Sequence, residues 1–138
     1  MALDYQKLKN WPFATVRKRY TREDSIRFAR GYGAGLPGPL QRDDECFISA
    51  EDLRVLPKMA VALADGEFWQ QDPETGLQWQ KIVHAEEMIT MHRPLPAEGE
   101  ILLDREVTAI YDRGSSRGAR FLERQTLSDV AGRPIVGI

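Results

Sequence analysis

The sequence predicts an α+β domain in which a curved antiparallel sheet wraps around a buried helix. Three observations carry this prediction: a capped amphipathic helix early in the chain, a short and almost wholly apolar segment after Pro57, and strand-like runs separated by turn residues in the last third. With 138 residues, 42% hydrophobic and 29% charged, the chain has the size of one ordinary domain. We therefore assign residues 1–138 to a single domain.

The first helix is expected over residues 22–32, directly after a short strand at residues 15–20. Thr21 is its expected N-cap, and Asp24 stands three residues later, where its carboxylate completes a capping box. Ala29 is expected on the buried side. The glycine-rich and proline-rich string "GYGAGLPGP" (residues 31–39) predicts a loop that ends the helix.

A second helix is expected from Pro57, because proline suits the first helical position and the string "KMAVALAD" follows it before Gly66. Because this segment is almost wholly apolar, we expect it to be buried. The string "FWQQDPETG" (residues 68–76) is rich in turn-forming residues and predicts a loop.

The last third of the chain predicts four antiparallel strands. The first is expected over residues 82–94 and the second over residues 101–112. The third is "ARFLERQTLSD" (residues 119–129), and "VAGRP" predicts a hairpin turn into a fourth strand that stops at Ile138 with part of its ladder unmade, so more of it is expected to follow. One face of the second strand is expected to consist of Ile101, Leu103, Val107, Ala109 and Tyr111.

Composition excludes several functional classes. A net charge of −2 and a pI of about 5.7 provide no basic field for nucleic acid or an anionic membrane. One cysteine and two histidines argue against disulfides and against a structural zinc site, so no metal is expected. No segment approaches the roughly 20 apolar residues of a membrane span, and the N-terminus lacks the apolar core of a signal peptide. We therefore expect no membrane association and a cytoplasmic location.

Four strings together resemble a known family: "YTREDSIRFARGYGAG", "LPKMAVAL", "VHAEEMITMHRPLPAEGEI" and "IYDRGSS". They are similar to the N-terminal half of the MaoC-like (R)-specific enoyl-CoA hydratases and dehydratases, the hydratase 2 type. The resemblance extends from Thr15 to Ile138 and is most specific between His84 and Arg113. It implies the hot-dog fold and an acyl-CoA thioester as substrate, with no separate cofactor.

The resemblance also implies a division of labour between two hot-dog halves. In the family, the catalytic half carries a Gly-Asp-x-Asn-Pro-x-His loop whose Asp and His activate the water that adds to the enoyl group. No such string occurs here, and "ARGYGAGLPGP" has glycine and leucine where the two catalytic groups would stand. We therefore expect no catalytic residue in this chain and a second hot-dog domain as partner, in a homodimer or a heterodimer or further along the same polypeptide.

The resemblance assigns four residues to substrate binding. The positions matching His84 and Ala85 lie against the acyl-CoA in the family, and a small residue at 85 lets a backbone edge approach the ligand. Arg113 matches a lysine that touches the CoA phosphates, and Gly114 lets that loop bend. A family glutamate falls on Ile48; whether Glu45, three residues earlier, replaces it stays open.

Two other functions compete with the hydratase half. A non-catalytic acyl-CoA-binding hot-dog module also predicts the absence of the Asp and His pair, and a hot-dog thioesterase would use Glu45 or Glu51 as its carboxylate. Adjacent Glu86 and Glu87 point to opposite faces of a strand and do not form an acid and base pair. The methionines at 59, 88 and 91 line an acyl tunnel or belong to an ordinary core.

Overall fold

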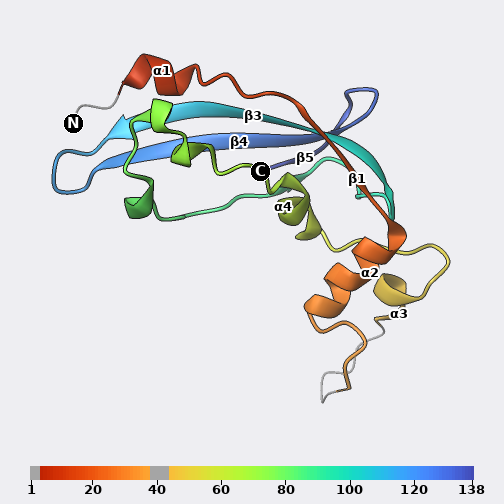
Figure 1. Ribbon diagram of the computed structural model, residues 1–138. Helices are drawn as coiled ribbons and strands as arrows, with labels where there is room; N and C mark the ends of the chain where they lie inside the picture. The colour runs from red at the N-terminus through yellow and green to blue at the C-terminus, as the bar shows by residue number, and fades with distance from the viewer. Residues whose placement is uncertain (1–3, 38–43) are drawn as a thin grey trace.

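The computed structural model describes residues 4–37 and 44–138, which form one curved antiparallel sheet with short helices along it (Figure 1). The five strands lie in the order β1-β3-β4-β5-β2. This arrangement is the hot-dog fold that the sequence predicted. The strands are β1 (Val16–Tyr20), β2 (Thr90–Met91), β3 (Gly99–Asp112), β4 (Ala119–Asp129) and β5 (Pro134–Gly137). The helices are α1 (Tyr5–Lys9), α2 (Arg22–Gly31), α3 (Glu45–Ile48), α4 (Met59–Ala64), η1 (Trp69–Gln71), η2 (Pro73–Thr75) and η3 (Trp79–Lys81).

The pairing of β3 with β4 forms the centre of the sheet. Its register runs from Ile101 opposite Asp129 to Asp112 opposite Ala119 and contains one irregularity, between Val107 and Ala109. The intervening Thr108 is the extra residue of a bulge, and its Oγ1 donates a hydrogen bond to the Leu122 carbonyl at 3.1 Å.

The bulge overturns part of the predicted strand face. Ile101, Leu103 and Val107 are buried as predicted, but Tyr111 is 52% exposed and Ile110 packs against the core in its place. An extra residue reverses the side to which every later side chain points, so the prediction of a single face through Tyr111 was wrong beyond Val107.

Two apolar clusters cover the concave face of the sheet. The larger lies under α4 and near α2. The smaller joins α1 and η1 to the far end of β3, and its Trp69 ring contacts the rings of both Trp11 and Phe13. The buried members of the larger cluster are Tyr20, Met59, Ala60, Leu63, Ala64, Leu95, Ile101, Leu103, Leu127, Ile135 and Val136. Those of the smaller cluster are Leu8, Trp69 and Val107. The sequence did not predict α1, although Leu8 is fully buried.

Both predicted helices form. Thr21 and Asp24 make the expected reciprocal capping box at the start of α2, and Ala29 is buried. Helix α4 begins two residues after Pro57, at Met59, and buries Met59, Ala60, Leu63 and Ala64, as its apolar composition requires. The predicted loop at residues 68–76 contains the turns η1 and η2. Part of the predicted loop at residues 31–39 lies outside the described residues. None of the helices in the described ranges is long and apolar enough to cross a lipid bilayer.

The strand predicted over residues 82–94 is mostly wrong. Only Thr90–Met91 join the sheet, by pairing with Gly137 and Val136 of β5. Residues 82–89 lie outside the ladder. Strand-forming composition alone therefore did not determine pairing.

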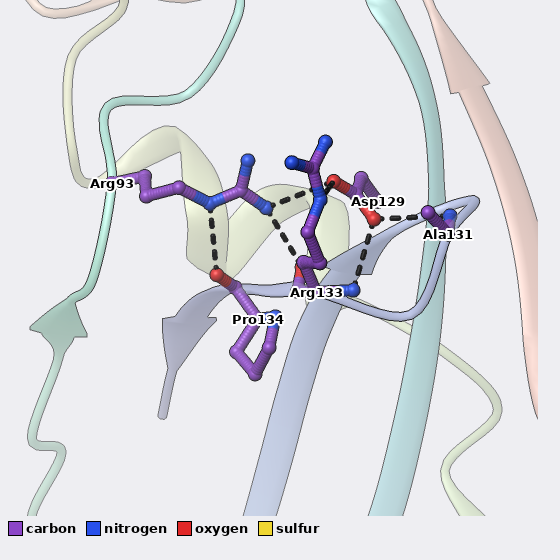
Figure 2. A network of polar contacts seen from close by, with 5 residues as sticks. All are labelled: Arg93, Asp129, Ala131, Arg133 and Pro134. Atoms are coloured by element: carbon purple, nitrogen blue, oxygen red, sulfur yellow. Dashed lines mark hydrogen bonds and ion pairs between the residues drawn. The ribbon is translucent and has the colours of Figure 1, made fainter.

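The turn between β4 and β5 is fixed by Asp129, as Figure 2 shows. This carboxylate accepts the backbone N–H groups of Ala131 and Arg133 at 3.0 and 2.9 Å, and the guanidinium groups of Arg133 and Arg93 at 2.9 and 3.1 Å. Arg93 also donates to the carbonyls of Arg133 and Pro134 at 2.8 and 3.1 Å. The network attaches the segment that follows β2 to the tip of the hairpin.

We expect this network to make the stability of the protein sensitive to acid. The backbone N–H of Arg133, then the guanidinium groups of Arg133 and Arg93, lower the pKa of Asp129 below its ordinary value. The stabilisation is therefore present above the carboxyl pKa of the unfolded chain and is lost as the pH falls through the folded value. In urea titrations from pH 6 down to pH 2, Asp129→Asn should lose less stability on acidification than the parent protein. Asp65→Asn, at a residue with an exposed side chain, is the control and should retain the parent slope.

Candidate functional site

The β3–β4 hairpin presents the predicted phosphate-binding residues. Arg113 is exposed, and its Nη2 donates to the Arg117 carbonyl at 3.1 Å. Gly114 has φ +83°, in the left-handed region that favours glycine, and its N–H donates to the Asp112 carboxylate at 2.8 Å. The turn therefore has the bend expected at Gly114 and leaves the Arg113 side chain open to solvent.

The other two predicted residues lie on the extended segment before β2. His84 and Ala85 are both exposed. The His84 Nε2 atom lies 3.0 Å from the Glu86 carbonyl, a contact in which the ring nitrogen is the donor. The His84 side chain is thus not enclosed within the sheet.

Two ion pairs hold this segment against the rest of the domain. Glu86 accepts a hydrogen bond from Arg120 of β4 at 2.7 Å, and Glu87 pairs with Lys58, which directly precedes α4. The two adjacent carboxylates thus contact different elements, as expected for side chains that point to opposite faces. Neither is available as the partner of the other in acid–base chemistry.

The Glu86–Arg120 pair brings the two predicted substrate-binding segments to the same end of the sheet. Arg120 is the ladder partner of Tyr111, which precedes Arg113 by two residues. His84 and Ala85 precede Glu86 directly, so all four predicted residues belong to segments joined at this contact. This contact could not be predicted from the sequence, since the residues it joins are 34 positions apart.

A polar stripe crosses the concave face between the two apolar clusters. The Glu123 carboxylate accepts hydrogen bonds from Trp69 Nε1 at 2.9 Å and Gln125 Nε2 at 3.0 Å. Arg105, the ladder partner of Gln125, donates to the Glu67 carbonyl at 2.9 Å and lies over the Phe13 ring, 5.1 Å from its centroid. Both Glu123 oxygens are engaged, which suits a positioning carboxylate better than a base. Sequence reasoning missed this stripe.

A surface pocket of about 430 Å³ lies elsewhere, beside α2. Its lining residues are Asp24, Arg27, Phe28, Gly31, Tyr32 and Met59. The helix follows Tyr20, which pairs with Gly99 at the start of β3, whereas Arg113 follows the other end of that strand. A 14-residue strand is about 45 Å long at about 3.3 Å per residue, so the pocket and Arg113 are not assigned to one ligand.

The carboxylates considered for a thioesterase lie outside both regions. Glu45 begins α3 and Glu51 follows it; both are exposed, and neither lines the pocket. Within the described ranges, no group of three or more His, Cys, Asp or Glu side chains is arranged to hold a metal ion. The methionines considered for an acyl tunnel do not share one environment, because Met59 is buried and Met88 is 72% exposed.

Comparison with known proteins identifies the relatives of this chain. The family model described as the FAS1-like dehydratase domain region matches residues 8–137. The chain is 28% identical over 102 residues to the peroxisomal multifunctional enzyme type 2 of Mus musculus, covering 70% of this chain and 14% of that enzyme. It is 33% identical over 97 residues to a UPF0336 protein of Parafrankia sp. (strain EAN1pec), covering 67% of this chain and 63% of that protein. The chain thus spans less than two thirds of either relative.

The fold has a counterpart among solved structures. The crystal structure of a MaoC-like dehydratase from Phytophthora capsici superposes with a TM-score of 0.72 at 24% identity. The match covers 96% of this chain and 45% of that one. At this identity the similarity shows the shared fold.

The Glu86–Arg120 pair should be a weak positional contact and not a determinant of folding. Its side chains are 64% and 45% exposed, so we expect a coupling of about 0.2–1 kcal/mol in the free energy of unfolding. A double-mutant cycle with Glu86→Gln and Arg120→Gln, followed by urea titration, measures it. A coupling that persists in 1 M salt, where exposed pairs are screened, would contradict this assignment.

Proposed function

Because the chain belongs to the FAS1-like dehydratase domain region family, we propose that it is the substrate-binding hot-dog half of an (R)-specific enoyl-CoA hydratase or MaoC-like dehydratase. The hot-dog fold and the family membership support a hydratase or dehydratase type of function. The finer proposal is that this half binds an acyl-CoA thioester. A second hot-dog domain or subunit then supplies the catalytic Asp and His.

The observation that carries the proposal is the meeting of two sequence-distant segments at one end of the sheet. The Glu86–Arg120 ion pair joins the segment containing His84 and Ala85 to the strand that follows Arg113. An acyl-CoA presents a thioester and a phosphate group separated by a long flexible arm, and such a ligand suits two recognition points on different segments. A compact ligand would not need both.

Each of the four residues has a distinct proposed role. Arg113 pairs with a CoA phosphate through its exposed guanidinium, and Gly114 gives the hairpin the bend that presents it. Ala85 leaves the backbone accessible to the pantetheine arm, since its side chain is one methyl group. His84 contacts the ligand beside it.

The reaction of the assembled enzyme is the reversible addition of water to a trans-2-enoyl thioester. The water oxygen bonds to C3, a base takes the proton released from the water, and an acid delivers a proton to C2, giving the (3R)-hydroxyacyl thioester. The negative charge that develops on the thioester oxygen requires backbone N–H donors nearby. This chain holds the substrate; the proton-transfer groups come from its partner.

The runner-up is a non-catalytic acyl-CoA-binding module, which the absence of a Gly-Asp-x-Asn-Pro-x-His string also favours. A thioesterase is less well supported, since Glu45 and Glu51 are exposed and lie outside the pocket. The hydratase half and the non-catalytic module differ in one respect: only the hydratase half leads to hydration when a catalytic half is added.

We expect the isolated chain to bind crotonyl-CoA without hydrating it. Loss of the ultraviolet absorbance of the enoyl thioester should appear only after a hot-dog protein carrying the Asp and His loop is added. Hydration by the isolated chain would overturn the proposal, and release of free CoA would favour the thioesterase. Binding that never leads to hydration with any such partner would favour the non-catalytic module.

Replacing Arg113 should weaken CoA binding. A charge-assisted contact with phosphate is worth about 1–3 kcal/mol, so Arg113→Ala should raise the Kd for CoA by the corresponding factor in isothermal titration calorimetry. Arg117→Ala, on the same hairpin and with the same change of charge, is the matched control. An unchanged Kd for Arg113→Ala, or an equal loss for both variants, would remove Arg113 from the site.

A further inference from the structure

An exposed tyrosine lies on the convex face of the sheet, near the β3–β4 hairpin. Ile110 and Phe121 are ladder partners, and both pack against the smaller apolar cluster on the concave face. Side chains alternate between the two faces of a sheet, so the next pair along the ladder, Tyr111 and Arg120, lies on the convex face. Tyr111 is 52% exposed. Figure 1 shows this hairpin at the end of the sheet that lies far from α2.

The Tyr111 ring has no partner in the part of the chain that the structure describes. Two other exposed aromatic rings, those of Tyr32 and Phe68, contact Phe28 and Trp79 at centroid distances of 5.0 and 6.0 Å. No described residue makes a ring contact with Tyr111 or a hydrogen bond to its hydroxyl group. Tyr111 therefore presents an aromatic surface that no described contact occupies.

A cation without a carboxylate partner lies next to this ring. The backbone N–H of Arg113 donates to the Gly118 carbonyl at 3.0 Å, which continues the antiparallel pairing one residue beyond β3. Residues two positions apart on an extended chain lie on the same face, about 7 Å apart, so Arg113 shares the face of Tyr111. Within the described ranges the Arg113 guanidinium contacts the Arg117 carbonyl and no carboxylate. A ring and a positive charge are thus available together on one face.

This combination suits a purine nucleotide. A base stacks on an aromatic side chain, and a phosphate group pairs with a guanidinium. In CoA the adenine base and the phosphate groups are attached to one ribose, so both can reach two side chains that are about 7 Å apart along a strand. The thioester is carried at the far end of the pantetheine arm.

We propose that Tyr111 stacks on the adenine base of CoA and makes this chain select CoA thioesters over thioesters of protein-bound phosphopantetheine. This inference rests on the proposed function, in which Arg113 pairs with a CoA phosphate. A thioester on a carrier protein has the same pantetheine arm and a phosphate, but it has no adenine. Arg113 therefore binds a group that both carriers have, whereas Tyr111 contacts the group that only CoA has.

The order of the protein groups agrees with the order of groups along CoA. Tyr111 is the ladder partner of Arg120, and Arg120 forms an ion pair with Glu86 at 2.7 Å. Ala85 and His84 directly precede Glu86. A ligand whose base lies on Tyr111 can thus extend its pantetheine arm across the Arg120–Glu86 pair to the segment proposed to contact the arm and the thioester.

Isothermal titration calorimetry with two ligands tests the inference. The probes are CoA and 4′-phosphopantetheine, which has the arm and one phosphate but no adenosine. Tyr111→Leu in the 138-residue chain should raise the Kd for CoA by about tenfold, because a stacked base is lost, and should leave the Kd for 4′-phosphopantetheine unchanged. Tyr111→Phe keeps the ring and should bind both ligands as the parent does. Tyr5→Leu, at a tyrosine of α1 that is 47% exposed, is the matched control and should change neither Kd.

Two further measurements keep the test decisive. Tyr111→Thr also removes the ring and suits an exposed strand, so it replaces Tyr111→Leu if thermal unfolding shows that the leucine variant is not folded. In nuclear magnetic resonance spectra of the parent with CoA, nuclear Overhauser effects should connect the adenine H2 or H8 proton to the Tyr111 ring protons. Their absence in a complex that does form would overturn the inference.

The outcomes separate this inference from the proposed function. Weaker CoA binding by Arg113→Ala together with an unchanged Kd for Tyr111→Leu would retain the function and reject the stacking. An equal loss for CoA and 4′-phosphopantetheine would also reject it, because the effect would not depend on adenine. A loss confined to CoA, without hydration when a catalytic half is added, would retain the nucleotide contact and reject the function. A parent chain that binds neither ligand would overturn both.

Discussion

The antiparallel ladder between β3 and β4 is the constraint on which the rest of the structure depends. It joins a 14-residue strand to an 11-residue strand and places the hairpin that carries Arg113 far from the helices at the opposite end. Every other strand takes its position from this pair, β1 on β3 and β5 on β4. The bulge at Thr108 shifts the phase of the β3 side chains, and the smaller apolar cluster spans it, with Val107 on one side of the bulge and Ile110 on the other.

The polar stripe between these clusters is unusual for the inner face of a sheet. Partly burying Glu123 and Arg105 beside apolar residues is costly unless hydrogen bonds replace those made to water, and Trp69, Gln125 and the Glu67 carbonyl provide them. The stripe therefore limits how far either apolar cluster extends along the sheet. The buried Nε atom of Arg105 in this stripe, like the Oε1 atom of Gln70 in η1, has no hydrogen-bond partner among the described residues.

The candidate site belongs to a different part of the sheet from the pocket beside α2. His84, Ala85, Arg113 and Gly114 lie on segments that make few apolar contacts and are placed by hydrogen bonds and ion pairs. Such contacts orient side chains while contributing little to stability. The ladder and the two clusters provide the rigid frame, and the hairpin and the segment before β2 lie exposed on it.

Local rules in the sequence determined much of this protein. Three features depend only on neighbouring residues and could be predicted from a short stretch of sequence. They are the Thr21 and Asp24 capping box, the run from Ala119 to Asp129 and the turn after it. The four residues proposed for the ligand came from resemblance to a family and not from such rules. Tertiary structure alone decided the bulge at Thr108, the burial of Leu8 and the position of residues 82–89 outside the sheet. Each of these depends on which distant strand or ring lies alongside, and a strand-like sequence becomes a strand only where another backbone edge is there to pair with it.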